Sequence, residues 1–100
     1  MKALEEGSRY RKEFRKVANV PRHRKDIHHI LNHVTSMLRS GTPMPERFKD
    51  HQLERMTGHR ECHLKPDLLL IYKPEKGVVR LARIGSHSDL YSKNFQVLGV

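Results

Sequence analysis

The sequence predicts an α+β fold in which two N-terminal helices pack on one face of a small, mainly antiparallel sheet. Two observations predict this class. Residues 8–41 repeat their apolar side chains at helical spacing, whereas residues 59–87 hold apolar runs of strand length joined by short turns. A length of 100 residues suits one domain with one modest core, so residues 1–100 are expected to form a single unit.

The first half of the chain begins with "MKALEE", a weak candidate for a first strand. Residues 8–19 then favour a helix, because Tyr10, Phe14 and Val17 recur at helical spacing. The basic residues between them fit either a solvated face or a face that binds phosphate or a partner.

A second helix is expected over residues 21–41. Gly41 is a natural C-terminal stop, and Pro43 and Pro45 prevent continuation. Its buried stripe follows an i, i+3, i+4, i+7 pattern that consists of Ile27, Ile30, Leu31, Val34 and Leu38.

The second half of the chain reads as three strands. "GHRECHL" alternates, which puts Glu61 and His63 on one face and Cys62 on the other as a small core residue. "KPD" is a turn, "LLLIYK" suits a central strand, and "PEKG" is a hairpin connection before the returning strand 78–87. The mildly apolar tail from Ser88 is expected to pack back as a short helix or an extended segment.

The charge of the chain limits its partners. Twenty Lys and Arg against eleven Asp and Glu give a formal net charge of +9, which favours a polyanion, first nucleic acid and second an acidic protein. Aromatic residues make up 6% with no Trp, so contacts to phosphate should dominate over base stacking. No apolar run approaches the roughly 20 residues of a membrane span. One cysteine excludes an internal disulfide and fits the cytosol.

The sheet face away from the helices should carry the chemistry. We expect it to present His63, Asp67, Arg83 and His87, with His51 added from the Pro-containing connector of residues 42–58. RNA carries its own nucleophile, the 2′-hydroxyl, so cleavage needs a base, an acid and stabilising cations, and histidine can serve as acid or base. The pattern by itself also allows an RNA-binding module without catalysis, or a metal site.

A second histidine pair, His29 and His33, has the four-residue spacing of zinc ligands on a helix. The Glu of the HExxH motif is missing from "HILNH", and both side chains point away from the apolar stripe. These two histidines are therefore expected to be exposed and without a ligand.

One block of the sequence resembles a known family. "KDHQLERMTGHRECHLKPDLLLIYKPEKGVVRLARIGSHSDLY" is similar to the C-terminal half of YafQ-type toxins of the RelE/ParE superfamily of toxin–antitoxin modules. The matching elements are "KDH", "KPDLLLIY", the lysine-rich hairpin and "GSHSDL", and the similarity covers roughly residues 42–91.

The resemblance implies a ribosome-dependent mRNA endonuclease of the bacterial cytoplasm, held inactive by a cognate acidic antitoxin. It implies mRNA and the ribosome as partners, and no cofactor, metal or membrane. The implied catalytic residues are His51, His63, Asp67 and His87. Of these, His87 is the candidate general acid, and the other three serve as base and balance charge. The implied RNA-binding residues are Lys49, Lys65, Arg83 and Tyr91.

Several alternatives stay open at this point. Leu68 stands where some members carry Trp, and Tyr91 where some carry Phe, which puts the stacking of a base in question. Arg83 fits a pair with an acid of the sheet as well as a phosphate contact. The rival functions are a ParE-like toxin that is not a nuclease, and a basic RNA-binding module without catalysis.

Overall fold

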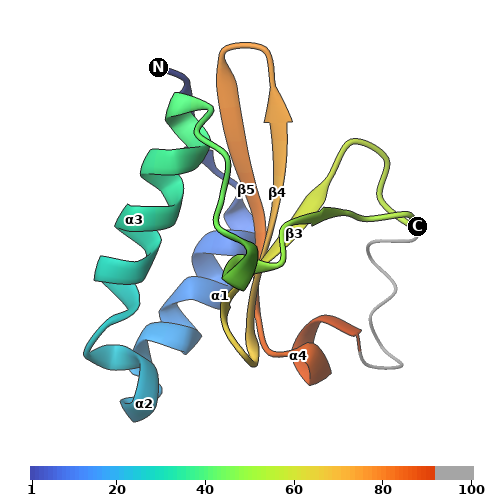
Figure 1. The fold of residues 1–100 in the computed structure, drawn as a ribbon. Helices are drawn as coiled ribbons and strands as arrows, with labels where there is room; N and C mark the ends of the chain where they lie inside the picture. The colour runs from blue at the N-terminus through green and yellow to red at the C-terminus, as the bar shows by residue number, and fades with distance from the viewer. Residues whose placement is uncertain (92–100) are drawn as a thin grey trace.

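The structure is a computed structural model that describes residues 1–91. One five-stranded sheet, in the order β1-β5-β4-β3-β2, carries the first three helices on one face (Figure 1). The elements in chain order are β1 Ala3–Glu6, α1 Ser8–Asn19, α2 Pro21–Arg24, α3 Ile27–Ser40, the 3₁₀ turn η1 Glu46–Phe48, β2 His51–Gln52, β3 Arg60–Lys65, β4 Leu68–Glu75, β5 Val78–Gly85 and α4 His87–Tyr91.

The predicted α+β class is confirmed. Strands β2 to β5 pair antiparallel in chain order, and the weak first strand joins β5 in parallel, so the sheet is mainly antiparallel. The short strand β2 pairs His51 with Glu61 and lies inside the segment that the sequence presented as a connector. This pairing fixes His51 against β3.

The single helix expected from Pro21 to Gly41 is wrong, because the chain turns between α2 and α3. Asp26 has a backbone φ of −126° and ψ of −1°, which leaves the helical range. Its carboxylate lies 2.8 Å from the Lys65 ammonium, which also donates to the Arg22 carbonyl at 2.9 Å. The turn is thus held by a strand more than thirty residues away, and no local pattern encodes such a contact.

Apolar side chains pack on both faces of the central strand. Leu68, Leu70 and Tyr72 belong to the main core beneath the helices, where Cys62 is also buried as expected. Leu69 and Ile71 form a second cluster with Leu90 of α4 on the opposite face. The expectation that this face lies open is therefore corrected, since α4 covers part of it. The continuous apolar run of β4 follows from this burial on both sides.

The chain after β5 turns directly into α4, so the predicted return of the tail begins as a short helix. The rest of that prediction falls on residues outside the described part. Among residues 1–91, no helix has the length and apolar character needed to cross a membrane.

Candidate active site

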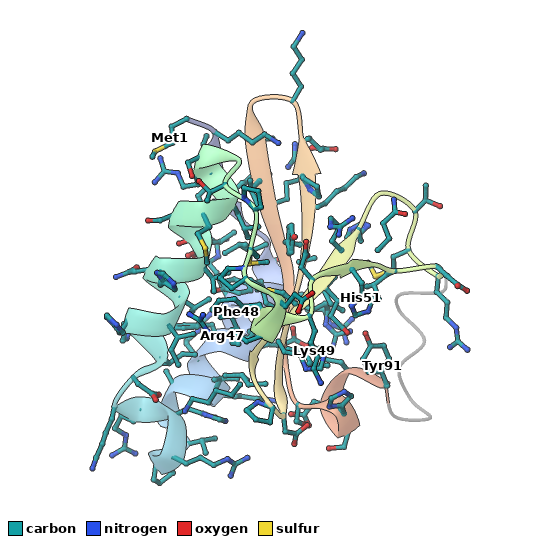
Figure 2. All side chains as sticks on the ribbon, in the orientation of Figure 1. Met1, Arg47, Phe48, Lys49, His51 and Tyr91 are labelled. Atoms are coloured by element: carbon teal, nitrogen blue, oxygen red, sulfur yellow. The ribbon has the colours of Figure 1, made fainter. Side chains whose placement is uncertain are left out.

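The candidate site lies where the β3–β4 turn, strands β2 and β3, and helix α4 approach one another. All four residues predicted to be catalytic lie on these segments, and each is joined to at least one other by a ring or charge contact or through Glu61. Figure 2 shows Lys49, His51 and Tyr91 on the side of the sheet away from α3. The sheet geometry therefore gathers predicted catalytic residues that are up to 36 positions apart in the chain.

Asp67 and His87 form the exposed half of the site. Oδ1 of Asp67 accepts from the His87 ring at Nδ1, 2.9 Å away, and from the His87 backbone N–H at 3.1 Å. A carboxylate accepts only, so Nδ1 carries a hydrogen and Nε2 is left for proton transfer. The side-chain hydrogen bond first, and the backbone one second, lower the pKa of Asp67 and keep it charged.

Glu61 forms the buried half of the site and was missed as a site residue. It is 4% exposed, and its Oε1 lies 3.4 Å from Nε2 of His51 and 4.0 Å from Nε2 of His63. The Tyr91 hydroxyl donates a hydrogen bond to Oε2. The strand alternation had already put Glu61 on the face of His63. A charged residue on that face next to two histidines was the signal that could have found it.

His63 connects the two halves. Its ring centroid lies 5.7 Å from that of His87, edge to face, while its Nε2 faces Glu61. Burial lowers the pKa of His63, and the charges of His87, Lys49 and His51 lower it further, against the opposing effect of Glu61. His63 is thus favoured in its neutral form, in which an imidazole can accept a proton.

His51 is held at its other nitrogen. Its Nδ1 donates to the Lys49 carbonyl at 2.8 Å, which leaves Nε2 on the side of Glu61. Lys49 adopts a left-handed backbone conformation with φ of 49° at the end of η1, and its side chain is exposed. The tight turn at Lys49 directs the chain from η1 into β2 and sets where His51 lies.

Besides Tyr91, which donates to Glu61, two of the four residues predicted to bind RNA are engaged within the fold. Lys65 joins the α2–α3 turn through Asp26. Arg83 is 4% exposed and binds Glu13 of α1, with its Nε and Nη2 at 2.8 and 2.5 Å from the same carboxylate oxygen. Arg83 thus pairs with an acid of helix α1, whereas the alternative considered from the sequence was an acid of the sheet. Contacts from these two residues to RNA stay a prediction.

Leu68, at the position that raised the question of base stacking, is 1% exposed and lies in the main core. Its side chain therefore offers no surface to a base at this site. Tyr91 is 40% exposed, and its ring lies 6.3 Å from the ring of His87. Of these two positions, only Tyr91 presents an aromatic ring beside the candidate acid.

The other candidate ligands do not assemble a metal centre. In residues 1–91 no group of three or more His, Cys, Asp or Glu side chains is arranged to hold a metal ion. His29 and His33 are exposed, and the His33 ring lies 6.1 Å from the Phe48 ring. Burial raises the pKa of the Cys62 thiol, so this side chain is neutral and acts as a core residue.

The fold and site together describe a class of protein, a small basic α+β domain with histidines and carboxylates gathered at one end of its sheet. Residues 3–92 match the family described as YafQ, bacterial toxins of type II toxin–antitoxin systems. This chain belongs to that family. The match also includes the helical half of the chain, whereas the resemblance seen in the sequence covered only roughly residues 42–91.

Individual relatives agree with this membership. The mRNA interferase toxin YafQ of Escherichia coli (strain K12) is 34% identical over 68 residues, which cover 67% of this chain and 74% of the relative. A DinJ–YafQ complex from E. coli contains a chain that is 30% identical, with a TM-score of 0.76 over 92% of this chain and 100% of its own. A copper-bound mutant toxin from Helicobacter pylori is 35% identical, with a TM-score of 0.81 over 91% and 100%.

A copper-bound form is known for one similar toxin, whereas residues 1–91 of this chain hold no group of three or more His, Cys, Asp or Glu side chains that could bind a metal ion. The histidines of the candidate site are instead each turned toward a carboxylate, a carbonyl or another ring.

Proposed function

We propose that this toxin is an mRNA endonuclease that cleaves mRNA in the decoding site of the ribosome by acid–base catalysis. The observation that carries this proposal is the unbroken series of contacts from Asp67 through His87 and His63 to Glu61. The series joins a histidine with a fixed exposed ring to a partly buried histidine that favours its neutral form. Relatives named as mRNA interferase toxins support the same class of substrate.

In the proposed reaction the 2′-hydroxyl oxygen of the RNA attacks the adjacent phosphorus. The new P–O2′ bond forms as the P–O5′ bond breaks, and the 2′ proton passes to a base. His63 or His51, both beside Glu61, is suited to take that proton. His87 gives the proton on its Nε2 to the departing O5′. The products are a 2′,3′-cyclic phosphate and a free 5′-hydroxyl.

Control by an acidic antitoxin in the bacterial cytoplasm belongs to the same proposal. A net charge of +9 favours an antitoxin segment rich in Asp and Glu, and it also favours ribosomal RNA. The E. coli relative has been solved in a DinJ–YafQ toxin–antitoxin complex. We expect association with the antitoxin of this chain to slow as salt screens the rim of the interface.

The test compares one mRNA free in solution and bound to programmed ribosomes. We expect cuts only within the codon in the decoding site, with 2′,3′-cyclic phosphate ends. The cuts should persist when a chelator removes loosely bound metal at a concentration that leaves the ribosomes intact. Equal cleavage of free mRNA would remove the ribosome from the proposal, and cleavage restored by one particular metal would overturn the acid–base mechanism.

A further inference from the structure

A cavity of about 320 Å³ lies next to the candidate active site, between α1, the start of α2 and the β5–α4 connection. Figure 1 shows α2 and α4 at the same end of the molecule. Ser86 and Asp89, which flank His87 in the chain, line one side of the cavity, and Leu68 contributes to it directly after Asp67. The cavity is therefore lined by chain neighbours of both Asp67 and His87.

The charges around this cavity are unbalanced. Its four cationic side chains outnumber its two carboxylates, Glu13 and Asp89. Glu13 is already bound by Arg83 and approached by Arg9 at 3.7 Å. The cations are Arg9, Lys16, Arg22 and Arg83.

Two of these cations are available to an incoming group. Within residues 1–91, the side chains of Lys16 and Arg22 make no hydrogen bond or ion pair. Both are exposed, and they belong to different helices on opposite sides of one turn. A guanidinium and an ammonium that share a concave site can bind the oxygens of one phosphate group.

A buried histidine forms part of the wall. His23 is 6% exposed, and its Nδ1 has no hydrogen-bond partner in the described part of the chain. An unpaired polar nitrogen at such a depth is costly unless a group from outside completes it. A phosphate oxygen that enters between Lys16 and Arg22 could supply either an acceptor or, when protonated, a donor to this ring.

We propose that the cavity binds a backbone phosphate of the RNA, next to the scissile phosphate at His87, with Lys16 and Arg22 as its cationic contacts and His23 in its wall. This inference rests on the proposed function, because it assumes that RNA lies across the Asp67–His87 pair. The contact holds the chain on one side of the scissile bond and so positions the 5′-oxygen relative to His87.

The first measurement is binding, and it does not depend on cleavage. Inorganic phosphate is titrated into the full chain while the ring signals of His23 are followed by NMR. A short single-stranded RNA with 2′-O-methyl groups, which has no nucleophile and is not cut, is titrated separately. Both probes are applied to wild type, to the double variant Lys16→Gln/Arg22→Gln, and to the control Lys12→Gln/Lys25→Gln, which removes the same charge outside the cavity.

We expect phosphate to shift the His23 signals in wild type and in the control variant, and not in the cavity variant. The cavity variant should bind the RNA roughly tenfold more weakly than the control, the scale of a charged hydrogen bond that is lost. Its plot of log affinity against log salt should be shallower by about 0.7, because one phosphate contact is lost. Thermal unfolding of both variants verifies that they are folded.

Equal phosphate and RNA binding by the cavity and control variants would overturn the inference. The inference would also be overturned if phosphate shifted the His23 ring signals but the affinity for RNA did not depend on Lys16 and Arg22. Loss of antitoxin affinity with RNA affinity unchanged would assign the cavity to a carboxylate of the partner instead. Failure of the proposed function would look different. In that case wild type would bind RNA through this cavity, but it would leave mRNA on ribosomes uncut.

Discussion

Asp67 holds His87 at two points, since one carboxylate oxygen accepts from both the ring Nδ1 and the backbone N–H of the histidine. The two hydrogen bonds fix the tautomer and the direction of the ring at the start of α4. Both side chains are more than half exposed, so the pair adds little to stability. Its consequence is orientation, which is what a proton donor at the leaving group requires.

His87→Ala should therefore reduce cleavage and spare the fold. We expect a loss of about 10²–10⁴-fold, the usual contribution of a positioned acid or base. Ribosome binding should persist, because it relies on Lys and Arg contacts to phosphate. The measurement pairs mRNA cleavage on programmed ribosomes with co-sedimentation of the variant.

The matched control for this variant is His29→Ala, which removes an exposed imidazole on the opposite side of the sheet. It should cleave like wild type. Full cleavage by His87→Ala would end the role assigned to this residue. Lost cleavage together with lost sedimentation would make it a contact residue.

Glu61 and Tyr91 should be energetically coupled, because the Tyr91 hydroxyl donates to a carboxylate that is almost fully buried. Tyr91→Phe should lower the free energy of unfolding by about 1 kcal/mol, which is below the roughly 1.5–3 kcal/mol of hydrogen bonds to charged groups because Tyr91 is partly exposed. In a Glu61→Gln background the same change should cost less.

A double-mutant cycle by denaturant unfolding measures this coupling. We expect an interaction energy of at least about 0.5 kcal/mol, as for residues in one hydrogen-bond network. Strictly additive effects would show that the hydroxyl does not stabilise the carboxylate. Tyr91→Phe should keep most of the cleavage activity, because the ring beside His87 remains.

Glu13 should be a major determinant of stability, although it belongs to a helix remote from β5 in the chain. Its carboxylate accepts from the buried Arg83 guanidinium and from the Ile84 backbone N–H at 3.2 Å. Glu13→Ala leaves the buried Arg83 guanidinium and the Ile84 N–H without this acceptor, and should cost about 3 kcal/mol. The control is Glu54→Ala at an exposed position, with an expected change of at most about 0.5 kcal/mol. Unfolding in urea compares them, and equal midpoints would contradict the prediction.

The sheet and the positions of His63, Asp67 and His87 could be predicted because their signals are local. Apolar runs, a Pro-containing turn and a glycine hairpin define β3 to β5, with His63 on β3, Asp67 in the turn before β4 and His87 two residues after β5 at the start of α4. The features that could not be predicted depend on contacts between distant segments. The helix expected over residues 21–41 is interrupted at Asp26, whose carboxylate binds Lys65 of β3. Glu13 of α1 pairs with Arg83 of β5, 70 positions away in the chain.

The buried half of the site was partly readable. Alternation along β3 put Glu61 beside His63, but two facts were needed to identify it as a site residue. One is that β2 pairs His51 with Glu61, and the other is that α4 brings Tyr91 over the same carboxylate. A two-residue strand and a five-residue helix have too little periodicity to be recognised in a sequence.

The pH dependence of stability should reveal the titration of His23, the buried histidine in the wall of the cavity between α1, α2 and the β5–α4 connection. Burial lowers the pKa of His23 below its ordinary value of 6.5, and the charges of Lys65 and Arg22 lower it further, while Asp26 and Asp67 oppose them. The folded state therefore disfavours the proton that the unfolded state accepts. The stability linked to His23 is fully present above pH 6.5 and is lost as the pH falls toward the lowered pKa.

The lowered pKa values of Asp26 and Asp67 act in a different window, since their contribution is lost only as the pH falls below their ordinary value of 3.8. Urea unfolding between about pH 7.5 and pH 5 thus isolates the histidines. Wild type should lose stability across this range. His23→Phe, which keeps a ring and removes the titration, should lose less, whereas the exposed control His29→Phe should follow wild type.

The buffer must contain no phosphate, because an anion in the cavity would stabilise protonated His23 and flatten the wild-type profile. Parallel profiles for wild type and His23→Phe in such a buffer would show that His23 takes up its proton equally well in the folded and unfolded chain.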